Sequence, residues 1–191
     1  MISAKTTENI LSYNVINSPL SSCIESILYH IIHSNSPAFK YLVCLNPHSY
    51  RVAKSDEIFN VSLSNADWVI PDGVGILIAS KILNGKIKER ITGFDIFCNV
   101  MKHANENNLS IFLLGSTSDT LKTICAKIKI DYPNALVAGT YSPPFKDKFS
   151  KSDTDIMVSC INKSNARILF VSLSAPKQEK LIYNILQNVN V

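Results

Sequence analysis

Short apolar runs alternate with longer segments of helical periodicity along most of this chain, and this alternation restricts its fold more than any other feature. The runs end in residues typical of turns, and they lie at 41–45, 67–70, 111–114, 135–138 and 168–171. Between them, apolar residues recur every three or four positions, as they do in amphipathic helices. Apolar strands separated by helices are typical of a parallel sheet that is covered on both faces. The pattern therefore predicts an α/β protein.

In more detail, we expect a Rossmann-like parallel sheet with helices on both faces, preceded by a small N-terminal α/β segment. That segment includes an amphipathic helix over 22–33. Residues 73–83 alternate too poorly for an edge strand, so a buried helix is predicted there, whereas 139–145 are expected to form a loop. A length of 191 residues favours a single domain, to which we assign 1–191.

The composition excludes several classes of protein. The chain is 46% hydrophobic and 18% charged, unlike a disordered chain, a collagen or a coiled coil. Its apolar runs are far shorter than the roughly 18 residues that a membrane span needs. The five cysteines lie far apart without a CxxC motif, so we expect no metal centre and no disulfide framework, and a reducing cytosol fits best. A net charge of +4 without a basic, aromatic-rich stripe gives no indication of nucleic-acid binding.

Polar segments, several of them containing glycine or proline, follow the predicted strands. In parallel α/β sheets, ligands bind outside the carboxyl ends of the strands, where such loops converge. We therefore expect one composite site at that edge of the sheet, with contributions from Asn46, Asp72–Gly73, 115–117, 141–145 and 172–178.

Asp72 directly follows a predicted strand and precedes a predicted helix. It could be the N-cap of that helix, which would contribute about 1 kcal/mol, or a general base that accepts a proton from an attacking hydroxyl. One carboxylate could do both, because it has two oxygens. The glycines after it do not complete a G-x-G-x-x-G fingerprint, and the chain has neither a P-loop nor a G-x-S-x-G motif. An oxidoreductase, a nucleoside triphosphatase and a serine hydrolase therefore each lack their main sequence marker.

Arg90 and Gln178 are two further side chains with clear binding chemistry. The planar guanidinium of Arg90 suits a diphosphate, although it could instead pair with Asp95 or Glu89. The amide of Gln178 lies at the last strand-to-helix junction, where it could contact a uracil or a sugar hydroxyl. Phe145 could stack on a base, but closing the core is the more common role of such a residue.

Five blocks of sequence, in consistent order, resemble the signature blocks of the WecG/TagA/CpsF glycosyltransferases. The three strongest are Pro-Asp-Gly-Val-Gly-Ile (71–76), Glu-Arg-Ile-Thr-Gly-Phe-Asp-Ile-Phe (89–97) and Ala-Pro-Lys-Gln-Glu (175–179). Phe-Leu-Leu-Gly (112–115) and Gly-Thr-Tyr-Ser-Pro-Pro-Phe (139–145) agree with them.

The resemblance implies an inverting, metal-independent transferase without a cofactor. It would move an N-acetylmannosamine-type sugar, or the corresponding uronic acid, from UDP onto a polyprenyl-diphosphate-linked N-acetylglucosamine during synthesis of a cell-surface polysaccharide or teichoic acid. The enzyme would be cytoplasmic and peripheral on the inner face of the membrane. Asp72 falls at the family's proposed general base, and substrate contacts are implied for Asn46, Gly73, Arg90, Thr92, Gly93, Asp95, Gly115, Gln178 and Glu179. This assignment requires Asp72 and Gln178 to meet at one rim of the sheet.

The chain departs from the family pattern at several points. Cys44 stands where relatives often have threonine, and Ser172 and Ser174 stand where Gly-x-Gly is common. Family members usually continue in a basic, membrane-associating tail, whereas this sequence ends at Val191. We therefore expect weak nucleotide binding, slow turnover and an apolar surface that favours a dimer or larger assembly. One alternative stays open, a non-catalytic module that binds a nucleotide sugar or a polyprenyl phosphate.

Overall fold

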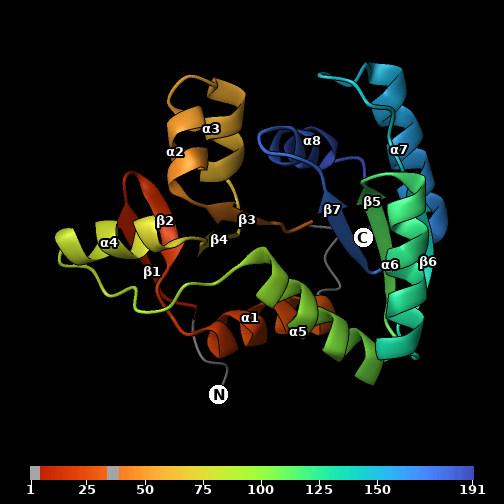
Figure 1. The fold of residues 1–191 in the computed structure, drawn as a ribbon, viewed down its shortest axis with the longest axis horizontal. Coiled ribbons are helices and arrows are strands. Elements are labelled where there is room, and N and C mark those ends of the chain that lie inside the picture. Colours follow the sequence, from red (N-terminus) through yellow and green to blue (C-terminus); the bar gives the residue numbers. More distant parts are fainter. Residues whose placement is uncertain (1–4, 34–38) are drawn as a thin grey trace. The chain divides into compact units, whose positions relative to one another are not determined.

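The computed structural model describes residues 5–33 and 39–191, which form two compact units with one β-sheet in each (Figure 1). Unit 1 contains the described residues 5–33 and 40–100, and unit 2 contains 39 and 101–191. Parallel strands alternate with helices in both units, which confirms the predicted α/β class. The strands are divided between two sheets, and the assignment of the chain to a single domain stays a prediction.

The sheet of unit 1 has the strand order β1-β2-β4-β3. Its strands are β1 (Thr7–Ile10), β2 (Tyr13–Ile16), β3 (Leu42–Leu45) and β4 (Trp68–Pro71). β1 and β2 form an antiparallel hairpin, whereas β4 runs parallel to both β2 and β3. The hairpin turn places Leu11 and Ser12 at φ values of 52° and 80°. Glycine or asparagine usually occupies such positions, so the sequence carried no recognisable turn signal there.

The helices of unit 1 include two that follow β3 directly. They are α1 (Leu20–His33), α2 (Pro47–Ala53), α3 (Glu57–Ser64), α4 (Val74–Ile82) and the first part of α5 (Gly93–Glu106), which continues into unit 2. α1 contacts β4, because the indole Nε1 of Trp68 donates to Ser26 Oγ at 3.2 Å. The sequence pattern predicts only a turn after the strand at 41–45, whereas the structure starts α2 there. A proline in the first turn after an asparagine N-cap is a helix-start signal that could have identified it.

α4 confirms the helix predicted over 73–83, but the prediction that it is buried was wrong. Only Ile76 and Ser80 of this helix are buried, while Val74, Ile78 and Ile82 are exposed. The helix packs against β1 on one side (Figure 1). Because apolar residues lie all round it, the sequence contains no polar face that would have marked the exposed side.

The sheet of unit 2 is fully parallel, with the strand order β6-β5-β7. Its elements are β5 (Ser110–Gly115), α6 (Ser118–Asp131), β6 (Leu136–Tyr141), α7 (Lys151–Ser164), β7 (Ile168–Ser172) and α8 (Lys177–Ile185). Phe112 and Leu114 of β5 belong to a core cluster with residues of α7 and α8. Ile111 and Leu113 are also buried and point to the opposite face, as expected for alternate residues of a strand. The central strand is therefore covered on both faces.

Strand β6 is longer than predicted, because residues 139–141 continue it where a loop was expected. Gly139 lies against the ring of Phe112, and a Cβ at this position would come within 2.7 Å of that ring. The strand pairs with β5 beyond a register shift next to Phe112. Long-range packing on Phe112 thus overrides the local loop signal of this glycine.

In the described part of the chain, no helix is long and apolar enough to cross a membrane.

Candidate active site

The carboxyl ends of β3 and β4 bring Asn46 and Asp72 together in unit 1. The two strands are parallel neighbours, and Leu45 is paired with Pro71 in their register. The backbone N–H of Asp72 donates to the carbonyl oxygen of Leu45 at 2.9 Å. Asn46 is the first residue after β3 and Asp72 is the first residue after β4, so both lie at the same edge of this sheet.

The segment between α4 and α5 reaches the same edge. The N–H of Ile91 donates to the carbonyl oxygen of Pro71 at 3.1 Å. Gly93 lies beside Cys44 of β3, since a Cβ on this glycine would be 3.5 Å from the cysteine Sγ. Unit 1 therefore brings most of the predicted site residues to one edge: Asn46, Asp72, Gly73, Arg90, Thr92, Gly93 and Asp95.

Asp72 is not the N-cap of α4. Gly73 occupies that position, with φ at 110°, and no side chain caps the helix. In the part of the chain that the structure describes, no hydrogen bond or ion pair involves the Asp72 carboxylate, and the residue is only partly exposed. The structure thus removes the capping role and leaves this carboxylate available for proton transfer.

The side-chain oxygen of Asn46 has a structural role, whereas its side-chain nitrogen has none within the described part of the chain. Its Oδ1 accepts from the N–H of Ser49 at 2.9 Å, and its own N–H donates to Ser49 Oγ at 2.8 Å. This capping box starts α2. Among the described residues, Asn46 Nδ2 has no acceptor, so an N–H donor remains at the sheet edge.

Thr92 and Asp95 form a second capping box, at the start of α5. Asp95 Oδ2 accepts from the N–H of Thr92 at 2.9 Å and from its hydroxyl at 2.6 Å, while Thr92 Oγ1 accepts from the N–H of Asp95 at 3.1 Å. These bonds from Thr92 lower the pKa of Asp95, and the positive charge of Arg90 adds a smaller effect in the same direction. Both residues hold the helix start in place, and their substrate contacts stay predictions.

Arg90 is exposed and carries a guanidinium that no described residue engages by a hydrogen bond or ion pair. The alternative pairing with Glu89 is not seen among the described residues, where the Glu89 carboxylate accepts from the backbone N–H of Leu20 at 3.0 Å. Asp95 is occupied by Thr92. The alternative of a structural ion pair is therefore not seen, and Arg90 offers several N–H donors next to the segment that contacts Pro71.

The carboxyl edge of the second sheet, in unit 2, depends on Gly115. This residue has φ at 121°, and a Cβ would overlap the backbone of Ser172 on β7. The next N–H, of Ser116, donates to the carbonyl oxygen of Ser172 at 3.1 Å. Gly115 therefore allows β5 and β7 to approach closely, and a ligand contact by it stays a prediction.

Gln178 is oriented by two hydrogen bonds. Its Oε1 accepts from the N–H of Leu173 at 3.2 Å, and its Nε2 donates to Glu179 Oε1 at 3.4 Å. Glu179 is only 4% exposed, and burial raises the pKa of its carboxyl. Its Oε2 is buried without a hydrogen-bond partner among the described residues. The Gln178 amide can therefore offer an N–H more readily than its carbonyl oxygen.

Phe145, after β6, is fully exposed, so the expectation that it closes the core was wrong. Tyr141, at the end of β6, packs instead against the core cluster of unit 2. The ammonium group of Lys177 lies 5.9 Å from the centre of the Phe145 ring, a cation–π distance. The residue before Gln178 therefore contacts an exposed aromatic ring within unit 2.

Asp72 and Gln178 follow strands of different sheets. Asp72 comes after β4 of unit 1, and Gln178 lies in α8, after β7 of unit 2. This corrects the expectation that one sheet rim carries both groups. Sequence periodicity shows that a strand exists, but it does not show which sheet the strand joins.

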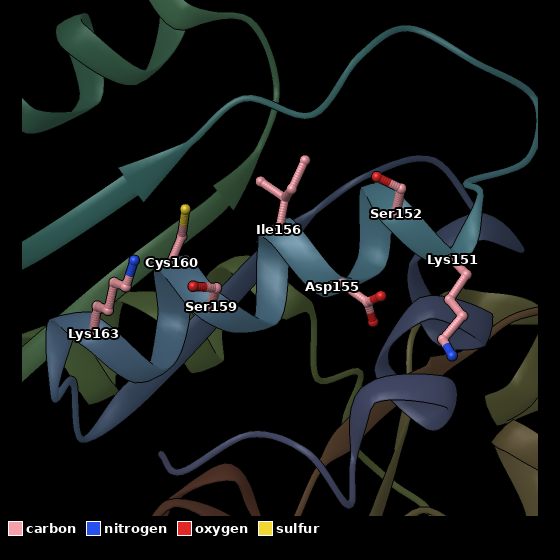
Figure 2. A pocket seen from close by; sticks show the side chains of 7 residues that line it. All are labelled: Lys151, Ser152, Asp155, Ile156, Ser159, Cys160 and Lys163. Carbon is pink, nitrogen blue, oxygen red and sulfur yellow. The ribbon is translucent and has the colours of Figure 1, made fainter.

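A shallow hollow on α7 contains none of the predicted site residues (Figure 2). It is lined by Lys151, Ser152, Asp155, Ile156, Ser159, Cys160 and Lys163, all from this one helix. Figure 2 shows Ser152 and Ile156 on one side of the helix and Lys151 and Asp155 on the other. Within the described ranges, no cluster of three His, Cys, Asp or Glu side chains could hold a metal ion. The hollow therefore adds no group to the candidate site.

Comparison with known proteins shows which family the sequence resembles. Residues 8–191 match the sequence profile of the glycosyl transferase WecG/TagA/CpsF family. A protein of Bacillus subtilis (strain 168) is 32% identical over 93% of this chain, and one of Bacillus spizizenii is 27% identical over the same share. One of Staphylococcus aureus (strain NCTC 8325) is 23% identical over 91%. All three are named N-acetylglucosaminyldiphosphoundecaprenol N-acetyl-beta-D-mannosaminyltransferase, and the chain spans 66% of the length of each.

Proposed function

Because the chain belongs to the WecG/TagA/CpsF family of glycosyltransferases, we propose that it is a hexosyltransferase. The donor is a UDP-activated N-acetylmannosamine or the corresponding uronic acid, and the acceptor is a polyprenyl-diphosphate-linked N-acetylglucosamine. The names of the relatives support both the transferred sugar and the acceptor. The product belongs to the synthesis of a cell-envelope polysaccharide or teichoic acid.

One observation carries this proposal: a carboxylate without a capping role stands at the carboxyl end of β4. The backbone of Asp72 is held by its bond to Leu45, while no described residue engages its side chain. The N–H donors of Asn46 and Arg90 belong to segments at the same sheet edge. A carboxylate beside donors is the arrangement that a transferase needs, because one group removes a proton while others stabilise a leaving anion.

In the proposed reaction, Asp72 accepts the proton of the acceptor hydroxyl. The hydroxyl oxygen forms a bond to the anomeric carbon of the donor sugar as the bond from that carbon to the diphosphate breaks. Attack from the face opposite the leaving group inverts the configuration. UDP departs with the bonding electrons, and Arg90 offsets the negative charge that develops on it. No metal or cofactor has a part in this scheme.

Gln178 has a narrower role in this proposal than its sequence position indicated. Its Oε1 is occupied by Leu173 and its Nε2 has one N–H left after the bond to Glu179. We therefore propose that this remaining N–H donates a hydrogen bond to an oxygen of the substrate, on a phosphate or on the sugar. The remaining contacts, by Gly73, Thr92, Gly93, Asp95, Gly115 and Glu179, are part of the same proposal.

A lipid-linked acceptor requires the protein to work at a membrane surface. We place it on the cytoplasmic face as a peripheral protein, and we expect a homodimer. The location follows from the nature of the acceptor and from the family, whereas the homodimer is the expectation drawn from an apolar surface, and each is open to direct measurement.

The test is a transfer assay with UDP-N-acetylmannosamine and a short-chain polyprenyl-diphosphate acceptor. Asp72→Asn should lower turnover by about 10²-fold or more, because a general base typically contributes 10²–10⁴-fold. Asp119→Asn is the matched control, since its carboxylate lies on the exposed surface of α6. Equal turnover by the wild type and Asp72→Asn would remove Asp72 from its role. Stabilisation by UDP without any transfer by the wild type would favour the non-catalytic binding module instead.

A further inference from the structure

The exposed side of α4 carries an apolar stripe that the transfer reaction does not use. Val74, Ile78 and Ile82 are spaced four residues apart, so they lie one above another on the same face of the helix. They are 61%, 55% and 74% exposed, and Leu83, at the end of the helix, is 53% exposed. Large apolar side chains gathered on one helix face indicate a surface that another body covers.

Positive charge follows this stripe. Lys81 lies in the last turn of α4, and Lys86, Lys88 and Arg90 follow in the next segment, all of them exposed. Glu89 is the only acidic residue between 74 and 90. Its carboxylate accepts from the N–H of Leu20. The Glu8 carboxylate also lies beside this segment. Four basic residues against two acidic ones leave the stripe and its surroundings with a net positive charge.

A hydrogen-bond network around the buried Ser80 holds the basic segment against the helix. The Glu8 carboxylate accepts from the Ser80 hydroxyl and from the backbone N–H of Lys86. Ser80 Oγ in turn accepts from the N–H of Ile87 at 3.1 Å. A Cβ at Gly85 would overlap both the Glu8 carboxylate and the Ser80 hydroxyl, so a side chain at this position would disturb the network. The lysines are thus kept next to the apolar stripe.

We propose that this α4 face, defined by Val74, Ile78, Ile82, Leu83, Lys81 and Lys86, binds the surface of an anionic lipid bilayer. Apolar side chains on one face of a helix enter the boundary between headgroups and acyl chains, and lysines beside them bind anionic headgroups. A second copy of the chain fits this face less well. A two-fold contact would bring a net positive charge to the interface from each copy, and like charges repel.

The biological reason for this membrane contact rests on the proposed function, whereas the vesicle-binding test does not. Val74 is two residues after Asp72, so the apolar stripe begins within about 7 Å of the proposed base along the backbone. Contact between this face and the bilayer would bring Asp72 close to the plane in which the diphosphate of a lipid-linked acceptor lies.

The experiment measures co-sedimentation of the chain with vesicles of phosphatidylcholine, with and without phosphatidylglycerol. We expect binding to the anionic vesicles that weakens as salt is added. Lys81→Gln/Lys86→Gln should reduce that binding about tenfold or more, because each lysine near an anionic surface contributes about 1 kcal/mol. Ile78→Ser/Ile82→Ser should also reduce it by at least about tenfold, since two buried apolar side chains are lost.

Matched variants on other surfaces serve as controls. Ile58→Ser/Ile130→Ser changes two isoleucines that are exposed on α3 and α6, and Lys129→Gln/Lys148→Gln changes two exposed lysines. Both should bind vesicles like the wild type. Equal binding by the α4 variants and their controls would overturn the proposal. So would a mass measurement in solution showing a wild-type dimer that Ile78→Ser/Ile82→Ser abolishes, because the face would then belong to a second copy.

Transfer to a water-soluble acceptor separates this inference from the proposed function. The α4 variants should transfer sugar to that acceptor at the wild-type rate, since none of the substituted residues belongs to the proposed site. A chain that binds anionic vesicles through this face but transfers no sugar would support the membrane face and remove the proposed function.

Discussion

The backbone N–H of Asp72 donates to the carbonyl oxygen of Leu45 at 2.9 Å, which continues the pairing of β3 and β4 by one further bond. The bond fixes the backbone of the candidate base at the end of a buried strand. Its side chain is left without a partner among the described residues. A held backbone combined with an unoccupied carboxylate distinguishes Asp72 from Asn46, whose amide caps a helix.

This difference predicts unequal effects on stability for substitutions at these two positions. Asp72→Asn should change the free energy of unfolding by less than about 0.5 kcal/mol, because no contact is lost. Asn46→Ala should lower it by about 1 kcal/mol, the usual cost of removing an N-cap. Urea unfolding followed by circular dichroism measures both. A large loss for Asp72→Asn would show that its carboxylate has a structural role.

Gly73→Ala should destabilise the fold by about 1–3 kcal/mol, because the backbone there, with φ at 110°, is one that side chains rarely adopt. Space is not the obstacle, since the nearest atom to a new Cβ would be Asn46 Cβ at 3.7 Å. Gly93→Ala is the matched control. Its Cβ would meet Cys44 Sγ at an ordinary distance of 3.5 Å, and the residue begins α5. Thermal unfolding should leave the control unchanged, and equal shifts for both would contradict the backbone argument.

Gly115→Ala should cost more than about 2 kcal/mol, because two penalties add at this position. The residue has φ at 121°, and a Cβ would overlap the Ser172 backbone, so β5 and β7 would have to separate. Unfolding in urea measures the loss, and hydrogen exchange of the Ser116 amide should rise with it, since that amide donates to Ser172. An unchanged exchange rate would show that the strand pair tolerates the side chain.

The buried carboxyl of Glu179 should make stability fall as the pH rises. Burial raises its pKa in the folded protein above the ordinary value of 4.5, so the folded state binds this proton more tightly than the unfolded state does. Its stabilising effect is complete below that ordinary value and is lost as the pH rises through the higher folded pKa. Glu179→Gln has no such proton, so the Tm of the wild type should fall relative to that of the variant across this range.

The control for this pH series is Glu25→Gln, which changes an exposed carboxylate of α1. Its Tm difference from the wild type should stay flat over the same pH range. The slope against pH is compared, and not the absolute Tm, because an amide at position 179 places a new polar group in a buried site. A flat difference for Glu179→Gln would contradict the raised pKa.

Local patterns predicted the helices better than they predicted the sheets. The helix over 22–33 and the strand at 41–45 appear in the structure as α1 and β3, because periodicity and turn residues are local properties. The β1–β2 hairpin was not predicted, since its turn uses Leu11 and Ser12 in the left-handed region. The extension of β6 depends on the packing of Gly139 on Phe112, a contact that no local pattern contains.

The candidate site was likewise predicted from the sequence only in part. The order of polar residues after strand ends was enough to select Asn46 and Asp72, because parallel strands place their carboxyl ends at one edge. It was not enough to assign their roles. Either residue could cap a helix, and only the three-dimensional hydrogen-bond partners show that Asn46 does so and Asp72 does not.

The amino-acid sequence alone determined the α/β class and the positions of most elements, because these depend on spacing along the chain. It also carried the similarity to one family, through the residues of five ordered blocks. Tertiary structure decided which strands share a sheet, which side of α4 is exposed and which polar atoms are already occupied. Those properties depend on contacts between residues far apart in sequence, such as Glu8 with Ser80 or Gly115 with Ser172, and their hydrogen bonds and steric limits exist only once the chain has folded.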